Sequence, residues 1–528
     1  DEAIREHSAR VQSGLDLAGG PLVRVVFFDG GTAGASRLLF AAHHLVVDGV
    51  SLRVLLEDLD AACRRLPLAP RTTSFQEWAR LLTSAAAEGR FDTETAYWTE
   101  ATAGAGWRLP VDGTGPDLMG TQETVRLALS PELTRRLLQD VPGAYRTQVN
   151  DVLLAALARV LCGWTGERRL LVDLEGHGRE ELFEDVDLSR TVGWFTTMFP
   201  VALEAYEGWE QQIKHTKELL RAVPHRGLGY GVLRHLRGAL GELPAPQVSF
   251  NYLGQFDPGA GEGAGDGLCE SIVLNPGGEY APEEQRPHLL DVIGRVVDGR
   301  LVVDWAYSTS VHEAATVAEL AERFTAELTS LVEHCTAEGA GGVTPSDFPL
   351  ARLTQAEVDR VAGDGRQVED VYPLTPMQQG MLFHSLLEPD SSAYFEQLLF
   401  VLDGVTDVDA LARAWQRVTD TTPVLRTSLA WEDLDEPVQR VHRSVTFPVT
   451  VEDWTGLTED EQRAALAEFT AADERRGIDL TEAPLSRVAL FRLSETRVQV
   501  VWTFHHVLLD GWSLPLVMAD LFTAHRGG

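Results

Sequence analysis

The chain has 528 residues, 44% of them hydrophobic, and its formal net charge is −34 at pH 7. This length is too great for one hydrophobic core, and typical domain sizes predict about two to four compact units. The acidic charge, without a basic block, argues against binding to nucleic acid or to anionic membranes. No apolar run reaches the roughly 18 residues of a membrane-spanning helix. The four cysteines lie too far apart in the sequence for a disulfide framework: Cys63, Cys162, Cys269 and Cys335. We therefore expect a cytoplasmic protein.

The first predicted elements recur near the end of the chain. Strands are predicted at 22–28 and 38–42, followed by HHLVVDG (43–49) and a helix that Ser51 is placed to cap. Strands at 485–491 and 498–504, HHVLLDG (505–511) and a helix capped by Ser513 repeat this order. Four leucines should form one apolar stripe on the first helix: Leu52, Leu55, Leu56 and Leu59.

The spacing of the two copies predicts how the chain is divided. The histidine pairs are 462 residues apart, so the chain holds one full period and a short overlap. From the longer segment before the second pair, we expect about 90 residues of the first unit to lie upstream of residue 1. The second unit is expected to stop just after its motif.

Between the copies, apolar periodicity predicts helices at 149–161 and 317–331. A glycine-rich run at 258–267 is expected to be a surface loop, with strand-like sequence after it at 271–274 and 288–303. The glycine-rich stretch at 337–345 predicts a domain boundary. Strands and helices mix without strict alternation, which favours an α/β sandwich over a doubly wound sheet.

The paired histidines allow several chemical interpretations. Neighbouring residues on a strand point to opposite faces, so only one of His43 and His44 should line a cleft if the strand runs through both. The same geometry argues against a metal site, and no third ligand has a suitable spacing. Asp48 and Asp510 precede glycines, where a carboxylate more often fixes a turn or pairs with an arginine than takes a proton.

Several motifs carry a family resemblance. HHLVVDG and HHVLLDG resemble the HHxxxDG motif of condensation-type domains of nonribosomal peptide synthetases. EGHGRE (175–180), RTVGWFT (190–196), PHRGLGYG (224–231) and FNYLGQ (250–255) resemble motifs of epimerization domains. YPLTPMQQGML (372–382) and VLRT (424–427) resemble the first two motifs of condensation domains.

The resemblance implies a chloramphenicol acetyltransferase-like α/β fold of two lobes, with the active site between them. It implies a remnant of an epimerization N-lobe at 1–66, the C-terminal portion of that domain at 67–336, a linker at 337–370 and an incomplete condensation N-lobe at 371–528. The first unit would invert the Cα of a carrier-bound aminoacyl or peptidyl thioester from L to D. The second would accept the D-configured donor for peptide-bond formation.

The resemblance also assigns roles to residues of the first unit. His44 and Glu175 would be the acid-base pair, while His177 and Arg179 could be structural, with Arg179 pairing a carboxylate. Tyr230, Asn251 and Tyr252 could line the site or fill space beside it. The supporting residues are His43, Asp48, Gly49, His177, Arg179, Tyr230, Asn251 and Tyr252.

In the second unit, His506 would orient or deprotonate the attacking amine, with His505 in a supporting role. Asp510 is expected to be structural, and Arg426 is a candidate partner for it. Because the resemblance places the second lobe beyond the chain, we expect this copy to be inactive.

The implied partners are peptidyl carrier domains upstream and downstream, with the substrate held as a thioester on their phosphopantetheine arm. No cofactor or metal is expected to bind the chain directly. Two alternatives remain open, an acyltransferase that acts on a small alcohol or amine and a noncatalytic docking platform.

Overall fold

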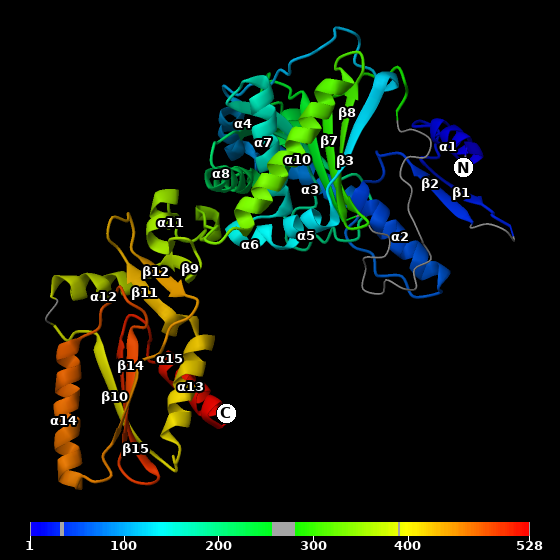
Figure 1. Ribbon diagram of the computed structural model, residues 1–528. Coiled ribbons are helices and arrows are strands. Elements are labelled where there is room, and N and C mark those ends of the chain that lie inside the picture. The colour runs from blue at the N-terminus through cyan, green and yellow to red at the C-terminus, as the bar shows by residue number, and fades with distance from the viewer. Residues whose placement is uncertain (1, 32–35, 256–279, 389–390, 527–528) are drawn as a thin grey trace. The chain divides into compact units, whose positions relative to one another are not determined.

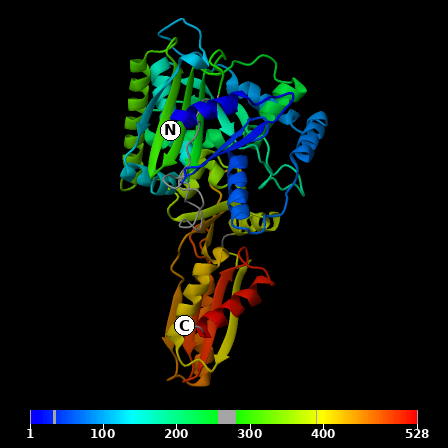
Figure 2. The same cartoon turned by 90° about the vertical axis from the view of Figure 1, so that its right-hand side faces the viewer.

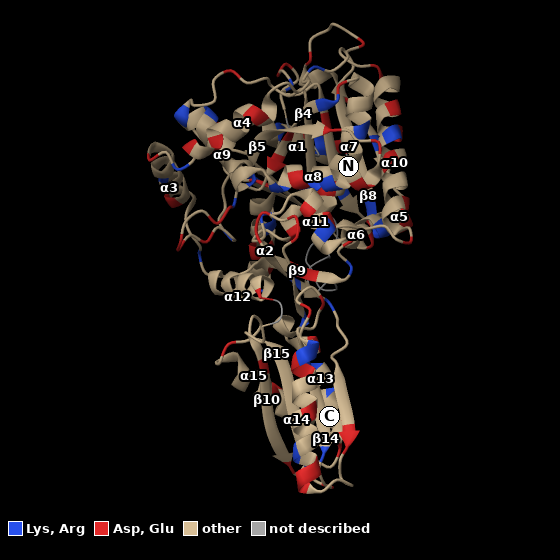
Figure 3. Ribbon diagram, turned by 90° about the vertical axis from the view of Figure 1, so that its left-hand side faces the viewer, with Lys and Arg blue, Asp and Glu red and all other residues tan. Residues whose placement is uncertain are grey.

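The computed structural model describes residues 2–31, 36–255, 280–388 and 391–526 (Figure 1). The chain divides into two compact units, Asp1–Ala340 and Gly341–Gly528, with the boundary inside the predicted linker. The predicted loop at 258–267, the strand-like segment at 271–274 and Cys269 lie outside the described residues. Acidic and basic residues are interspersed along the ribbon of both units (Figure 3).

A six-stranded mixed sheet forms the centre of the first unit. Its order is β3 (Gln122–Ala128), β8 (Arg300–Ser308), β7 (Leu290–Val297), β6 (Val248–Gln255), β4 (Arg169–Gly176) and β5 (Thr197–Glu204). The strand-like segment predicted at 288–303 forms β7 and the start of β8, and Asp298 and Gly299, both with positive φ, make the tight turn between them.

Helices cover one face of this sheet (Figure 1). The predicted helices at 149–161 and 317–331 are confirmed as α7 (Val149–Thr165) and α10 (Ala314–Thr336). Both pack on the sheet with α5 (Pro131–Gln139), α6 (Val141–Tyr145) and α8 (Trp209–Arg221), and α4 (Thr95–Thr102) and the short α9 (Leu228–Gly231) contact β5.

Side-chain alternation gives the sheet a second, polar face. On β4, Leu170, Val172 and Leu174 join the helix-covered core, so Asp173 and Glu175 point the other way. The same alternation on β6 and β7 adds three residues to this polar face, which we define as Asp173, Glu175, Ser249, Asn251 and Asp291. Polar side chains on three neighbouring strands therefore share one side of the sheet.

The remaining elements of the first unit lie around the motif loop. The predicted strand pair is confirmed as the antiparallel β1 (Val23–Phe28) and β2 (Arg37–Ala42), against which α1 (Glu2–Ser13) packs. The predicted helix after the motif is α2 (Gly49–Cys63), and α3 (Phe75–Ala87) follows.

The second unit contains two sheets (Figure 2). One has the order β10 (Phe395–Asp403), β15 (Arg497–His505), β14 (Ser486–Arg492) and β13 (Val449–Asp453), and confirms the predicted strand pair as β14 and β15. The other has the order β11 (Thr427–Ala430), β12 (Val438–His442) and β9 (Val368–Pro373). The helices are α11 (Gln355–Ala362), α12 (Pro376–Leu387), α13 (Val408–Thr421), α14 (Glu459–Arg476) and α15 (Ser513–Arg526).

Much of the predicted linker at 337–370 is folded. Thr354 and Glu357 form a capping box that starts α11, and β9 begins at Val368. Val343, Phe348 and Val358 are buried in a small apolar cluster of their own. Compositional bias toward glycine at 337–345 identified the boundary but not the apolar residues just beyond it.

The two copies of the repeat differ in how they are covered. Val25 and Phe27 on β1 are 55% and 64% exposed, whereas Val488 and Leu490 at the matching positions of β14 are buried in a core that includes α13 and α15. The predicted leucine stripe on α2 is also only partly buried, since Leu56 and Leu59 remain exposed. Amphipathic periodicity identified the helix correctly.

Candidate active site

The histidines of the first copy lie just beyond β2, in the turn that leads to α2. The His43 amide donates to Leu22 O at 2.9 Å, which closes the strand pairing, and His43 Nδ1 accepts the Leu45 amide at 3.1 Å. His44 Nδ1 is 3.1 Å from Val47 O. Because a carbonyl oxygen only accepts, Nδ1 carries the proton and neutral His44 has its Nε2 lone pair available.

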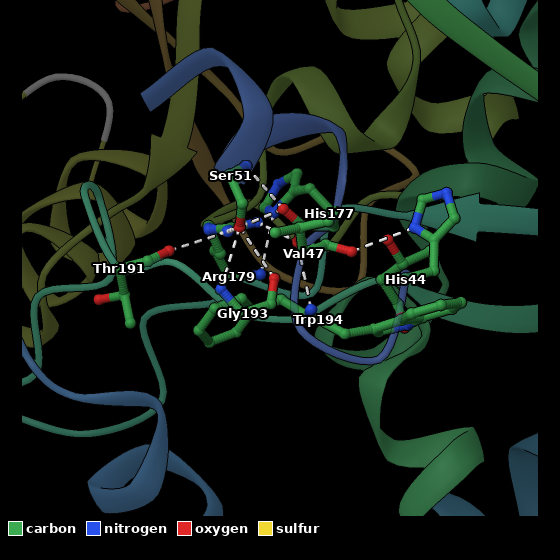
Figure 4. A network of polar contacts seen from close by, with 11 residues as sticks. His44, Val47, Ser51, His177, Arg179, Thr191, Gly193 and Trp194 are labelled. Carbon is green, nitrogen blue, oxygen red and sulfur yellow. Dashed lines mark hydrogen bonds and ion pairs between the residues drawn. The ribbon is translucent and has the colours of Figure 1, made fainter. Parts of the chain in front are cut away.

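Asp48 and Arg179 form a buried ion pair that joins the HHLVVDG loop to the EGHGRE segment (Figure 4). Two guanidinium nitrogens of Arg179 donate to the Asp48 carboxylate at 2.5 and 3.0 Å, and a third contact goes to Thr191 O at 3.1 Å. The same guanidinium lies 4.2 Å from the ring centroid of Phe195. The prediction that Arg179 pairs with a carboxylate is confirmed.

Asp48 also receives backbone hydrogen bonds. Its carboxylate accepts the amides of Ser51 at 2.7 Å and Phe195 at 3.1 Å. Burial alone would raise the pKa of Asp48, but hydrogen bonds from Arg179 and Ser51 outweigh it and hold that pKa below its ordinary value. Asp48 therefore remains ionised. Its carboxylate joins the start of α2, the EGHGRE segment and the RTVGWFT segment.

The start of α2 differs from the prediction. Asp48, not Ser51, is the N-cap, and Gly49 is the first helical residue. Ser51 is buried and instead donates its hydroxyl to Gly193 O at 2.9 Å, while the Gly193 amide donates back at 3.0 Å. The first amides of a helix have no partner within the helix, and an aspartate at the cap position can accept a hydrogen bond from one of them as a serine would.

Gly178 permits the close approach of the EGHGRE and RTVGWFT segments. Its φ is +65°, and a Cβ built there would lie 1.7 Å from Phe195 O. We expect Gly178→Ala to destabilise the fold by about 3 kcal/mol, since left-handed strain and backbone overpacking both contribute. Chemical denaturation should show this loss, with Gly143→Ala as the control because no atom lies within 4 Å of its Cβ position. Equal stability of both variants would contradict this packing.

Glu175 lies on the polar face near the end of β4 and retains solvent exposure. Asn251 Nδ2 donates a hydrogen bond to its carboxylate. Desolvation raises the pKa of Glu175 and Asp291 acts in the same direction, whereas His44, His288 and Asn251 lower it; the pKa is raised overall. The structure thus brings His44 within electrostatic reach of Glu175.

The other predicted residues of the first unit separate into two groups. Asn251 belongs to the site, whereas Tyr252 on the same strand packs against the helix-covered core. Tyr230 is buried beside Trp98, and its hydroxyl receives a hydrogen bond from Arg234. His177 Nδ1 accepts the Arg179 amide at 3.0 Å, so it shapes the turn.

Sequence reasoning missed several residues near the site. Trp194 packs edge-on against the His44 imidazole with ring centroids 5.0 Å apart, as Figure 4 shows. His288 Nε2 is 2.9 Å from Asp173 Oδ2, and its Nδ1 is 3.4 Å from Asp291 Oδ1. The i, i+3 spacing of His288 and Asp291 was visible in the sequence, but their shared partner Asp173 was not.

His288 gives the fold a specific pH dependence. Burial alone would lower the pKa of His288, but its bonds to Asp173 and Asp291 raise it from 6.5 to about 9. Because the pKa of His288 is higher in the folded chain, protonated His288 stabilises the fold fully below pH 6.5, and this contribution is lost as the pH rises through 9. We expect a loss on the order of 3 kcal/mol over that interval, measured by denaturant titration, and a much smaller one in His288→Gln. A stability curve of the same slope in both proteins would contradict it.

The second copy of the motif repeats part of this geometry within its own unit. His505 Nδ1 accepts the Val507 amide at 3.1 Å, as His43 does with Leu45. His505 is buried, and desolvation, with His506 acting in the same direction, lowers its pKa to about 4. His506 is half-buried, and its Nδ1 has no hydrogen-bond partner among the described residues. The tautomer of His506 is therefore not fixed as that of His44 is.

The predicted pairing of Asp510 with Arg426 is wrong. Asp510 is exposed and accepts the Ser513 amide at 2.8 Å and its hydroxyl at 2.7 Å, so here too the aspartate rather than the serine satisfies the orphan amide of the helix start. Arg426 is buried and pairs with Glu369 at 2.7 Å, while its Nε donates to Thr419 O. The carbonyls of Thr419, His442 and Arg443 and the carboxylate of Glu369 hold the Arg426 guanidinium instead.

Metal ligands and membrane spans are both missing from the part of the chain that the structure describes. There, no group of three or more His, Cys, Asp or Glu side chains is arranged to hold a metal ion. Within the same ranges, no helix is both long and apolar enough to cross a membrane.

The condensation domain family model matches residues 1–354 and 368–527. One subunit of the linear gramicidin synthase of Brevibacillus parabrevis is 45% identical over 99% of the chain, and one subunit of the mycosubtilin synthase of Bacillus subtilis is 36% identical over 99%. The chain spans only 7% and 20% of these relatives.

Solved structures agree on the fold. The epimerization domain from the third module of tyrocidine synthetase B is 37% identical, with a TM-score of 0.58 over 64% of this chain and 78% of that one. The condensation domain of the monacolin K polyketide synthase has the same fold at 20% identity, with a TM-score of 0.51 over 65% of this chain and 78% of that one. The predicted chloramphenicol acetyltransferase-like α/β fold is thereby confirmed. The chain belongs to the condensation domain family, as a domain of the type found in nonribosomal peptide synthetases.

Proposed function

We propose that the first unit is an epimerization domain that inverts the Cα of a carrier-bound aminoacyl or peptidyl thioester from L to D. The observation that carries the proposal is the buried Asp48–Arg179 ion pair, which joins the motif loop that carries His44 to the segment that follows Glu175 on β4. His44 also acts to lower the pKa of Glu175. The 37% identical epimerization domain of tyrocidine synthetase B supports the same assignment.

Inversion at Cα needs one group to remove a proton and another to deliver one to the opposite face. A positioned base of this kind contributes about 10²–10⁴-fold to a rate. Neutral His44 offers Nε2 because Nδ1 donates to Val47 O. Glu175 has a raised pKa, so it can hold or release a proton nearer neutral pH than an ordinary glutamate. The thioester carbonyl accepts the charge that develops while the proton is away.

The ion pair of Asp48 and Arg179 would hold the two groups at a fixed separation. Asp48 follows His44 by four residues in the motif loop, and Arg179 follows Glu175 by four residues after β4. Linking these two segments restricts the motion of the loop that carries His44 relative to the strand that carries Glu175. His43, Gly49 and His177 shape the turns on either side.

The substrate would arrive as a thioester on the phosphopantetheine arm of a peptidyl carrier domain, and no further cofactor enters the chemistry proposed for His44 and Glu175. Residues 1–66 would belong to the N-lobe of an epimerization domain and 67–336 to the C-terminal portion of that domain. Residues 371–528 would belong to the N-lobe of a condensation domain in which His506 serves the attacking amine. In this order inversion would precede condensation with the D-configured donor. Both reactions would take place in the cytoplasm.

Chiral analysis tests this function. A carrier domain is loaded with L-aminoacyl groups, incubated with the chain and hydrolysed, and the released amino acid is separated by chirality. We expect a mixture of D and L forms from either starting enantiomer. Acyl transfer to an added alcohol or amine without inversion would favour an acyltransferase, and recovery of unchanged L-amino acid would favour a docking platform; either result would refute the epimerase.

A further inference from the structure

The polar face also holds a row of charged and polar side chains that the proposed reaction does not use. Asp173, Ser249 and Asp291 are register neighbours on β4, β6 and β7. His288, which precedes β7, lies between the two carboxylates, 2.9 Å from Asp173 and 3.4 Å from Asp291. Its side chain is 5% exposed, so it is shielded from solvent.

Arg286 is a second cation that contacts this row. The Arg286 side chain has no exposed surface and donates to Asp291 at 2.6 Å, to Gln122 Oε1 at 2.6 Å and to Ala306 O at 3.0 Å. Asp117 lies 3.4 Å from the same guanidinium. Buried charges are costly unless they are paired and hydrogen-bonded, so this arrangement fixes Asp291 and through it His288.

The charge balance of the row bears directly on Glu175. Arg286 and His288 face the carboxylates of Asp117, Asp173 and Asp291, so the row has no spare positive charge. Asp291 opposes ionisation of Glu175, while His44, His288 and the Asn251 amide favour it. Of the two histidines, His44 lies on the exposed loop and would exchange protons in the reaction, whereas His288 is buried. His288 is therefore a buried cation that the proposed proton transfers do not use.

We propose that His288, held as a cation between Asp173 and Asp291, is a positioning residue that favours the ionised form of Glu175, the form that can accept the Cα proton. This inference deepens the proposed epimerase function and rests on it for its effect on rate. Its effect on the ionisation of Glu175 is independent of any substrate.

The sign of the effect follows from the neighbours. Loss of the His288 charge removes a cation that favours ionisation of Glu175, while Asp291 continues to oppose that ionisation, so the pKa of Glu175 should rise further. The acid limb of the pH-rate profile for inversion should then move to higher pH by about one unit or more, since one nearby opposite charge shifts a carboxyl by that much. The rate at high pH, where Glu175 is ionised in either case, should change far less.

The first experiment measures inversion from pH 5 to pH 9 for the full chain, with a carrier domain loaded with an L-aminoacyl group. His288→Gln should move the acid limb upward, and His288→Lys, which restores a cation, should return it toward the wild-type position. His215→Gln is the matched control because His215 pairs with Glu204 on β5 rather than with a residue of the polar face. An unmoved limb in folded His288→Gln would overturn the proposal.

The second experiment needs no activity. The chain is labelled with glutamate carrying carbon-13 at the side-chain carboxyl, and the Glu175 signal is identified by its loss in Glu175→Gln. Its titration midpoint should lie higher in His288→Gln than in wild type and return in His288→Lys. Identical midpoints would refute the role of His288 whether or not the chain inverts its substrate, and a shifted midpoint without inversion would place the failure in the proposed function alone.

Discussion

Replacing Glu175 by glutamine is expected to slow Cα inversion by about 10²–10⁴-fold, the usual contribution of a positioned acid-base group. Glutamine keeps the shape of the side chain and can still contact Asn251, but it cannot take or give a proton. The loss should therefore appear in the rate rather than in the stability of the fold. The rate is measured as the appearance of D-amino acid from an L-aminoacyl carrier.

A matched control separates this effect from a general disturbance of the sheet. Glu123→Gln alters an exposed glutamate on β3, which is separated from β4 by three strands in the sheet. We expect this variant to invert its substrate at the wild-type rate. If Glu175→Gln inverts as fast as Glu123→Gln, Glu175 has no acid-base role.

Removing the charge of Arg179 should cause the largest loss of stability. The side chains of Arg179 and Asp48 are 8% and 3% exposed, so Arg179→Met leaves a buried carboxylate without its counter-ion. Breaking a buried pair in this way costs about 3–5 kcal/mol. Denaturant unfolding near pH 7 should show the loss. It should shrink as the pH falls, because protonation of Asp48 removes the unpaired charge.

Two further variants test the cause. Asp48→Asn in the Arg179→Met background removes the stranded charge and should recover part of the stability, which a double-mutant cycle quantifies. Arg80→Met removes an exposed arginine that pairs with Glu77 on α3, and little change is expected. Equal losses for Arg179→Met and Arg80→Met would show that the buried pair does not stabilise the first unit.

Local sequence patterns predicted most of the elements that position the site. The two strands and the helix around each histidine pair follow from alternation and apolar periodicity, and the structure has them within one or two residues. The resemblance brought His44 and Glu175 together in prediction, and the structure has them within electrostatic reach. The sequence also predicted that Arg179 could pair with a carboxylate, although 131 residues separate it from Asp48.

The errors arose where long-range contacts decide the outcome. Arg426 pairs with Glu369, which lies 57 residues away in the sequence, whereas Asp510 accepts the amide of Ser513 at the start of α15. The leucines of α2 form the predicted apolar stripe, but its spacing does not determine how far another element covers it, and Leu56 and Leu59 remain exposed. The row of His288, Asp173 and Asp291 depends on the parallel pairing of β4, β6 and β7, which no short sequence pattern specifies.

Movement of the Cα proton of a carrier-bound thioester between two faces is tested most directly by hydrogen exchange. The chain is incubated in D₂O with an L-aminoacyl carrier domain, and the released amino acid is analysed by mass spectrometry. We expect deuterium to enter at Cα, and its entry to slow strongly in Glu175→Gln and in His44→Ala. Deuterium incorporation no faster with the wild-type chain than with the double variant His44→Ala, Glu175→Gln would contradict it.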